Sequence, residues 1–251
     1  MKPSVCLTAV LAALLGATTI VAAAPGKGDS WRAARGLPGG NEEAAVRVRN
    51  AGGDGDVIEL EYDMPELEAV KTKSAGSEEA SRLVLGNAPS IGSPGKPVLP
   101  VVPCYVVLPA GETLDSVEVV CEEAQVLPGT HAVPHARKSV PLVPGAKPVE
   151  TPPDPDVYGS DDPWPRSAVK VISVQKKRGV SVLVVNLNPV VYQPKSGKVS
   201  LYPRMTLRVR SRKAAETKDD RFKVRYRPDK VRPLSLQVDN PSALTTYREE
   251  K

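Results

Sequence analysis

Few residues of this sequence could do chemistry, and its two histidines are the first to consider. His131 and His135 are four positions apart, a spacing that would place two metal ligands on one face of a helix. Pro134 stands between them in a proline-rich segment, and proline disfavours a helix there. No acidic or thiolate residue is near enough in the sequence to complete a zinc site. We therefore expect no metal centre and no cofactor.

The cysteines are the second candidates for chemistry. Cys104 and Cys121 lie in Val-rich stretches that predict strands, whereas a catalytic Cys–His pair needs an exposed thiol in an electropositive setting. Two interpretations of the pair stay open. They could form a disulfide, as in exported proteins, or they could be buried thiols that pack as small apolar groups. The disulfide depends on strand register, because a shift of one residue turns one cysteine to the other face.

The acidic residues give no stronger sign of a site. Asp154, Asp156, Asp161 and Asp162 lack the regular spacing of a calcium-binding loop, which favours a solvated acidic loop instead. The sequence also contains no glycine-rich phosphate loop and no Gly-x-Ser-x-Gly motif. We expect no catalytic residues, and therefore no enzyme activity in this chain.

Composition indicates which elements must position these residues. The chain has 251 residues, of which 41% are hydrophobic but only 4% aromatic, and it contains 26 prolines. Frequent valine favours strands, and frequent proline disfavours long helices. The net charge of +5 is spread along the chain, without the basic stripe and stacking aromatics of a nucleic-acid-binding protein. We therefore expect no nucleic-acid partner.

The N-terminus predicts export. Lys2 precedes an uncharged apolar run, and small residues at Val21-Ala22-Ala23 offer a cleavage site, so we predict a signal peptide over residues 1–23. The alternative is an uncleaved anchor helix, since a run of about 20 residues can span a bilayer. We predict a secreted, cell-surface or periplasmic protein, without a stable membrane span once the signal is cleaved. Residues 24–41 predict a flexible arm.

Period-two alternation and turn residues predict an all-β fold over residues 42–212, an antiparallel β-sandwich of the jelly-roll or Ig-like kind with Pro-rich loops. Residues 65–81 favour one helical turn, and residues 213–251 a charged tail or linker. The apolar faces of the strand at 180–187 predict a central strand covered on both sides. The predicted strands are a hairpin at 42–50 and 57–62, a hairpin at 101–108 and 114–121, then 169–174, 180–187, 189–192, 201–210 and a last short strand at 222–226.

A long loop over residues 127–166 is the main anomaly of this plan. Irregular connections beyond about 12–15 residues are usually functional or disordered. The loop is therefore the best candidate in the chain for contact with a partner.

Two blocks of residues resemble a known family. They are Pro94-Gly95-Lys96-Pro97-Val98-Leu99-Pro100, followed by Val106-Val107-Leu108-Pro109-Ala110-Gly111, and Asn188-Pro189-Val190-Val191-Tyr192-Gln193-Pro194 after a Val-rich strand. In order and spacing they resemble the N-terminal propeptide domain of gingipain-type cysteine peptidases. The resemblance implies a β-sandwich that assists folding of the peptidase and keeps it inactive, with a loop in the active-site cleft that presents a basic residue.

Arg137, with Lys138 beside it, is the pair that we expect to fill the pocket, and a solvated basic pair is the alternative. In family members a catalytic domain follows the propeptide, whereas this sequence stops at Lys251. We therefore expect a precursor fragment, or a free-standing inhibitor or folding aid, with a gingipain-type catalytic domain as partner in cis or in trans. The competing hypothesis is a surface adhesion or binding module whose Arg-rich strand at 199–210 binds anionic glycans or lipid.

Overall fold

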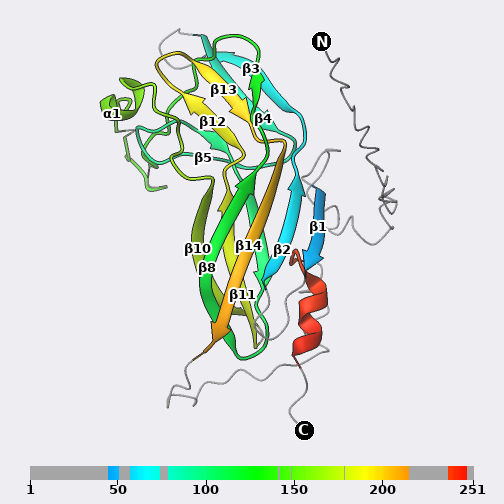
Figure 1. The fold of residues 1–251 in the computed structure, drawn as a ribbon. Helices are drawn as coiled ribbons and strands as arrows, with labels where there is room; N and C mark the ends of the chain where they lie inside the picture. Colours follow the sequence, from blue (N-terminus) through cyan, green and yellow to red (C-terminus); the bar gives the residue numbers. More distant parts are fainter. Residues whose placement is uncertain are drawn as a thin grey trace, which may run out of the picture.

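The computed structural model describes residues 45–50, 57–73, 79–140, 142–147, 149–177, 179–214 and 237–247. Strands dominate, and they form an elongated body with two sheets face to face in one half and short hairpins in the other (Figure 1). The predicted signal peptide (1–23), arm (24–41) and last strand (222–226) lie outside the described residues. Among the described residues, no helix has the length and apolar character needed to cross a membrane.

The first sheet of the sandwich has the order β1-β2-β14-β8, with every neighbouring pair antiparallel. The predicted hairpin of residues 42–50 and 57–62 is confirmed within the described residues, because β1 pairs with β2. The strands are β1 (Ala45–Asn50), β2 (Ile58–Asp63), β14 (Arg204–Lys213) and β8 (Glu112–Cys121).

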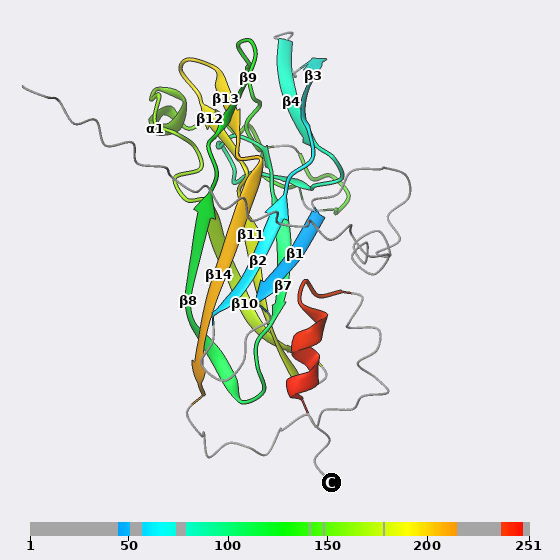
Figure 2. The ribbon, with the colours of Figure 1, turned by 45° about the vertical axis from the view of Figure 1, so that its right-hand side comes forward.

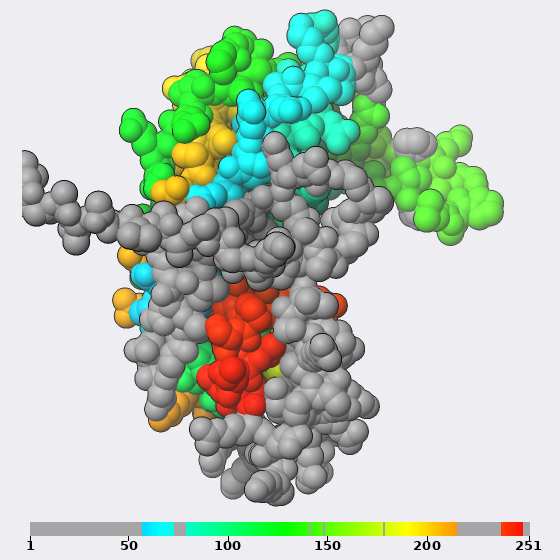
Figure 3. Space-filling view, turned by 90° about the vertical axis from the view of Figure 1, so that its right-hand side faces the viewer, coloured from blue at the N-terminus to red at the C-terminus, as the bar shows by residue number. Residues whose placement is uncertain are grey.

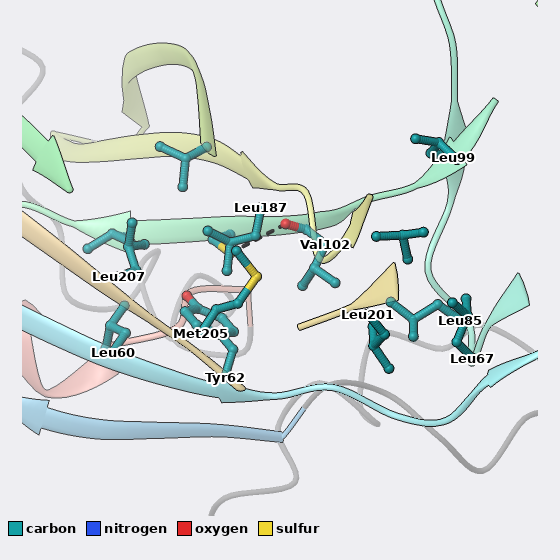
Figure 4. Packing of buried hydrophobic residues seen from close by; sticks show 14 of the residues in the cluster. Leu60, Tyr62, Leu67, Leu85, Leu99, Val102, Leu187, Leu201, Met205 and Leu207 are labelled. Atoms are coloured by element: carbon teal, nitrogen blue, oxygen red, sulfur yellow. Dashed lines mark hydrogen bonds between the residues drawn. The ribbon is translucent and has the colours of Figure 1, made fainter. Parts of the chain in front are cut away.

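The second sheet has the order β10-β11-β7 and lies behind the first in Figure 2. Its strands are β10 (Val169–Lys177), β11 (Val180–Leu187) and β7 (Val102–Val107). β11 pairs on both sides, with β10 and with β7, and buries residues on both faces, as its two apolar faces predict. Leu60, Tyr62, Met205 and Leu207 of the first sheet and Leu187 of the second meet in the core between the sheets (Figure 4).

The other half of the body is built from shorter strands in three small sheets. They are the three-stranded sheet β12-β13-β9, the hairpin β3-β4 and the pair β5-β6. Their bounds are β12 (Val190–Gln193), β13 (Lys198–Leu201), β9 (Gln125–Leu127), β3 (Leu67–Lys73), β4 (Glu79–Leu85), β5 (Ser90–Ile91) and β6 (Leu99–Pro100).

Two sequence-based expectations about local structure are wrong. The helical turn expected in residues 65–81 is replaced by β3 and β4, because Leu67 pairs with Leu85 and both side chains enter the core. Residues 201–210 are not one strand. Leu201 ends β13 and Arg204 begins β14, and proline at position 203 has no N–H to donate to a strand ladder. The alternation continues across the break, since Leu201 and Met205 are both buried in the core.

The predicted hairpin of residues 101–108 and 114–121 is also wrong, since its two strands belong to different sheets. β7 pairs with β11, whereas β8 pairs with β14. The connection passes through Gly111, whose φ of +77° suits glycine, and carries the chain from one sheet to the other.

Because β7 and β8 do not pair with each other, the possible disulfide between Cys104 and Cys121 across one hairpin is ruled out. Cys104 and Cys121 form no disulfide, and the Cys104 thiol donates to Val102 O at 3.4 Å. Cys104 is fully buried in the core between the sheets, and Cys121 is half-buried, with its pKa raised by burial. Both pack as small apolar groups, which was the alternative interpretation.

Part of the predicted charged tail is packed on the body. Residues 237–247, which we call the C-terminal strap, include the 3₁₀ helix η3 (Pro241–Thr246). Val238, Ala243 and Leu244 of the strap are buried in a second apolar cluster with Val107 and Val180 of the second sheet. The strap is the red element that lies along the body in Figure 3. The fold of this chain therefore includes a segment that the sequence pattern assigns to a linker.

Candidate functional site

The loop at residues 127–166 has a base of backbone hydrogen bonds with the proline-rich segment that leads into β6. Gly95 N donates to Ala136 O at 2.8 Å, Ala136 N donates to Lys96 O at 2.9 Å, and Val98 N donates to Pro134 O at 3.0 Å. The lead-in segment turns at Gly95 and Lys96, where Lys96 N donates to Ser93 O at 2.9 Å. Pro94 and Pro97, on either side of this turn, each form a single β-bridge with the loop. The base therefore fixes the backbone up to Ala136.

Tyr192 of β12 supports the loop from below. Its hydroxyl donates to His131 O at 3.0 Å and accepts from Val133 N at 3.3 Å. The hydroxyl of Tyr158, in the short helix α1 (Pro155–Tyr158), donates to Val133 O at 3.0 Å. Burial raises the pKa of both tyrosines, and proximity to Tyr192 raises that of Tyr158 further. Both hydroxyls therefore stay protonated and hold the buried Val133 in place.

The far end of the loop is attached to the same scaffold. Trp164 and Tyr192 exchange two backbone hydrogen bonds of 2.8 Å, and the Lys96 ammonium lies 4.8 Å from the centre of the Trp164 ring, a cation–π distance. Asp161 accepts from the hydroxyl and the backbone N–H of Ser196, and these bonds lower its pKa. The loop is therefore a constrained lobe although it has almost no regular structure.

The two histidines serve this lobe. His131 Nε2 lies 3.0 Å from Pro128 O, and His135 Nε2 lies 2.7 Å from Thr151 O. Across the described parts of the chain, no three His, Cys, Asp or Glu side chains gather as a metal site would require. The histidines connect backbone segments of the loop, and their geometry offers no catalytic pair.

Arg137 and Lys138 follow directly after the last bonded residue of the base. Both are exposed, and Lys138 is oriented through its backbone, because its N–H donates to Thr151 Oγ1 at 3.1 Å. Within the described residues, the Arg137 guanidinium has no hydrogen bond or ion pair. The basic pair is therefore presented on a constrained base with its charge available.

Sequence reasoning missed the apolar surface next to this pair. Val140, Leu142, Val143 and Val149 are all exposed. We call residues 139–140, 142–147 and 149 the apolar finger; they belong to the green projection that extends from the body in Figure 3. The signal available in the sequence was a run of aliphatic residues between prolines without a partner strand.

The Arg-rich face of β14, which motivated the adhesion hypothesis, is paired with acids. Arg204 Nε lies 2.6 Å from Asp63 Oδ1, and Arg208 Nε lies 2.8 Å from Glu59 Oε1. Arg212 Nε lies 3.5 Å from Asp115 Oδ1. Neighbouring strands balance these three charges, whereas Arg210 on the same face is exposed and pairs with no acid among the described residues. The adhesion hypothesis stays a prediction, with less free positive charge to support it than the sequence suggests.

A shallow surface pocket near the lobe offers no chemistry either. Its charged lining residues, Asp162 and Arg166, form an ion pair of 3.8 Å. The remaining lining residues are Pro163, Pro165, Ser167, Ala168, Asn188, Val191 and Tyr202. The lobe with its basic pair is therefore the better candidate site.

Comparisons with known proteins place this fold. The family model Propeptide_C25 matches residues 40–225, slightly beyond the predicted domain of 42–212. Among curated proteins, no relative matches the sequence.

Two solved structures from Porphyromonas gingivalis proteins are similar in fold. One is a complex of the pro- and mature domains of RgpB, with a TM-score of 0.51 and 17% sequence identity over 68% of this chain and 86% of that chain. The other concerns the zymogenic latency of gingipain K, with a TM-score of 0.53 and 18% identity over 68% of this chain and 100% of that chain. Since the family model spans most of the sequence, the chain belongs to the Propeptide_C25 family and contains a gingipain-type propeptide domain.

Proposed function

We propose that this chain inhibits the catalytic domain of a gingipain-type cysteine peptidase by placing Arg137 in its substrate pocket, and that it assists folding of that domain. The observation that carries the proposal is the exposed basic pair on a constrained base. A loop held in one conformation loses little entropy on binding, which favours inhibition. The two structural neighbours support the partner class, since one is a complex of pro- and mature domains and the other concerns zymogen latency.

Arg137 suits the role of pocket residue better than Lys138 does. A guanidinium can donate two parallel hydrogen bonds to a carboxylate, and such charge-assisted bonds are strongest in a desolvated pocket. Lys138 lies next in the chain, and the bond from its N–H to Thr151 fixes the direction in which the segment leaves the base. We propose Lys138 as an auxiliary contact at the pocket rim.

The location of this activity follows from the N-terminus. We propose that the apolar run in residues 1–23 directs the chain to the cell surface, the periplasm or the medium, where its peptidase partner would be matured. The partner is in cis if a catalytic domain continues the reading frame, and in trans otherwise.

Inhibition kinetics test the proposal. The full chain is titrated against the mature domains of RgpB and gingipain K, with a fluorogenic peptide as substrate. Arg137→Ala should raise the inhibition constant at least about tenfold, because a lost charge-assisted bond is worth roughly 1.5–3 kcal/mol. Lys138→Ala should have a smaller effect.

The control is Lys170→Ala, an exposed cation on β10 in the body of the sandwich. It should inhibit like the unaltered chain. An Arg137→Ala variant as potent as the control removes the pocket assignment. If the unaltered chain neither inhibits these peptidases nor improves their refolding at micromolar concentration, the proposed function is wrong.

A further inference from the structure

Four large aliphatic side chains of the apolar finger are exposed to solvent. Val143 and Val149 are each 60% exposed, Val140 is 37% exposed, and Leu142 is fully exposed. Contiguous apolar surface of this kind on a soluble protein marks an interaction site.

The finger is supported at both of its ends. Lys138 N and His135 Nε2 both bond to Thr151, whose hydroxyl in turn donates to Val149 O at 3.3 Å. At the tip, Ala146 N donates to Val143 O at 3.2 Å. Gly145 in this turn has a φ of +82°, and a side chain there would meet no other atom within 4 Å. The finger is therefore a turn on a fixed base that extends away from the body.

We propose that the apolar finger is a second anchor, which inserts Leu142 and Val143 into an apolar pocket of the peptidase catalytic domain beside the pocket that receives Arg137. This inference rests on the proposed function. It concerns a different contact, made by aliphatic side chains and not by the basic pair.

Continuity with the basic pair identifies the occupant. Leu142 follows Arg137 by five positions in the chain, so a partner that takes up Arg137 meets the finger at the rim of the same cleft. Lys147 is the one charged residue of the finger. This composition favours an uncharged, apolar binding surface on the partner.

Two other occupants are less suited to the finger. A bilayer surface favours basic clusters and interfacial aromatic residues, and the finger has a single lysine and no aromatic residue. A second copy of this chain would have to receive the finger on strand surfaces, since the large exposed valines and isoleucines outside the loop lie on strands, as at Val120 and Ile172.

The test compares two double variants of the full chain. L142S/V143S removes the aliphatic tip, and V120S/I172S removes two aliphatic side chains of 48% and 47% exposure from the sandwich body. Dissociation constants and inhibition constants are measured against the mature domains of RgpB and gingipain K. The finger variant should weaken binding about ten- to hundredfold, and the control variant less than about twofold.

A second arm separates the two anchors. The same measurements are made in the Arg137→Ala background and with peptidase whose active-site cysteine is blocked by a small irreversible inhibitor. The finger variant should show a similar fold-loss in each case, because contacts with separate pockets add approximately.

The outcomes distinguish the two proposals. If the unaltered chain binds neither peptidase, the proposed function fails and the second anchor fails with it. If the unaltered chain inhibits and L142S/V143S inhibits equally well, only the second anchor is overturned. Loss of self-association or of binding to anionic phospholipid vesicles in L142S/V143S, with peptidase binding unchanged, also overturns it and assigns the finger to those occupants.

Discussion

The C-terminal strap and the apolar finger are opposite cases of chain that lies outside the β-sheets. The strap has a polar sequence, yet Asp239 and Asn240 are fully buried in it. The finger has an aliphatic sequence, yet its Leu142 is fully exposed. Residue polarity therefore assigns both segments to the wrong environment, and hydrogen bonding to the body explains the strap.

The strap completes the open edge of β7. Asn240 accepts from Val107 N at 2.7 Å and donates to Val107 O at 2.9 Å, so one amide side chain replaces a paired strand residue. Asp239 accepts from Tyr105 N at 2.9 Å, and its own N–H donates to Tyr105 O at 2.8 Å. The Tyr62 hydroxyl of the facing sheet donates to the Asp239 carboxylate at 2.7 Å. An edge strand must satisfy these backbone groups, which explains why polar residues are buried here.

The finger has no corresponding edge to complete. Its one proline, Pro144, lacks a backbone donor, and the hydrogen bonds that Thr151 makes at the ends of the finger link residues of the loop to each other. Its aliphatic side chains therefore remain outside the body, available to another molecule.

The largest expected effect is at the strap. Asn240→Ala should lower the free energy of unfolding by about 3 kcal/mol, because it leaves the buried N–H and C=O of Val107 unsatisfied. Urea unfolding measures the change. The control is Ser242→Ala, an exposed neighbour that should shift stability by less than about 0.5 kcal/mol. Equal stability of the two variants would show that the amide does not complete the edge.

Leu244→Ala should have the next largest effect, about 2 kcal/mol, since it removes a buried side chain from the cluster with Val107 and Val180. Thermal unfolding followed by circular dichroism reports the loss. Thr245→Ala, at the adjacent exposed position, serves as the reference. A melting temperature unchanged in Leu244→Ala would contradict the packing of the strap on the second sheet.

Alkaline pH should weaken both regions through buried tyrosines. Burial raises the pKa of Tyr247 in the strap above its ordinary value of 10.0, and the hydroxyl donates to Leu108 O at 2.7 Å. Because the unfolded chain loses this proton first, the stabilisation is complete below pH 10 and declines as the pH rises further. Burial raises the pKa of Tyr158 and Tyr192 under the loop in the same direction.

Urea unfolding at pH values from about 8 to about 11 tests this dependence. Tyr247→Phe should be less stable at neutral pH and should lose less stability on alkalinisation. An identical pH profile for the variant and the unaltered chain would mean that Tyr247 ionises alike in both states.

The smallest stability effect should be at the finger. Leu142→Ala makes the same chemical change as Leu244→Ala, but on a fully exposed side chain, and should alter the free energy of unfolding by less than about 0.5 kcal/mol. Parallel urea titrations of the two variants compare the regions directly. A loss at position 142 as large as that at position 244 would mean that the finger packs on its own body in solution.

Local sequence patterns predicted the strands that have one apolar and one polar face, and the strand that is apolar on both faces. The hairpin of β1 and β2 and the central position of β11 were predicted in this way, and so was the long loop. Arg137 and Lys138 lie on that loop by their positions in the sequence, and the family resemblance suggested their role in the pocket, which stays a prediction. The apolar finger received no assignment, because aliphatic residues in an irregular segment carry no periodicity.

Long-range pairing could not be predicted from the same patterns. The alternation of residues 114–121 suits any antiparallel neighbour, and the structure pairs β8 with β14 instead of β7. With that choice Cys104 and Cys121 are no longer cross-strand neighbours in one hairpin, and they form no disulfide.

The amino-acid sequence alone therefore specifies the all-β class and the loop at 127–166, since these depend on local backbone preferences. The partners of each strand and the burial of Asp239 and Asn240 depend on contacts between residues far apart in the chain, as does the exposure of Leu142. Only the tertiary structure determines these features, because open strand edges and apolar contact surfaces exist only after distant segments have been brought together.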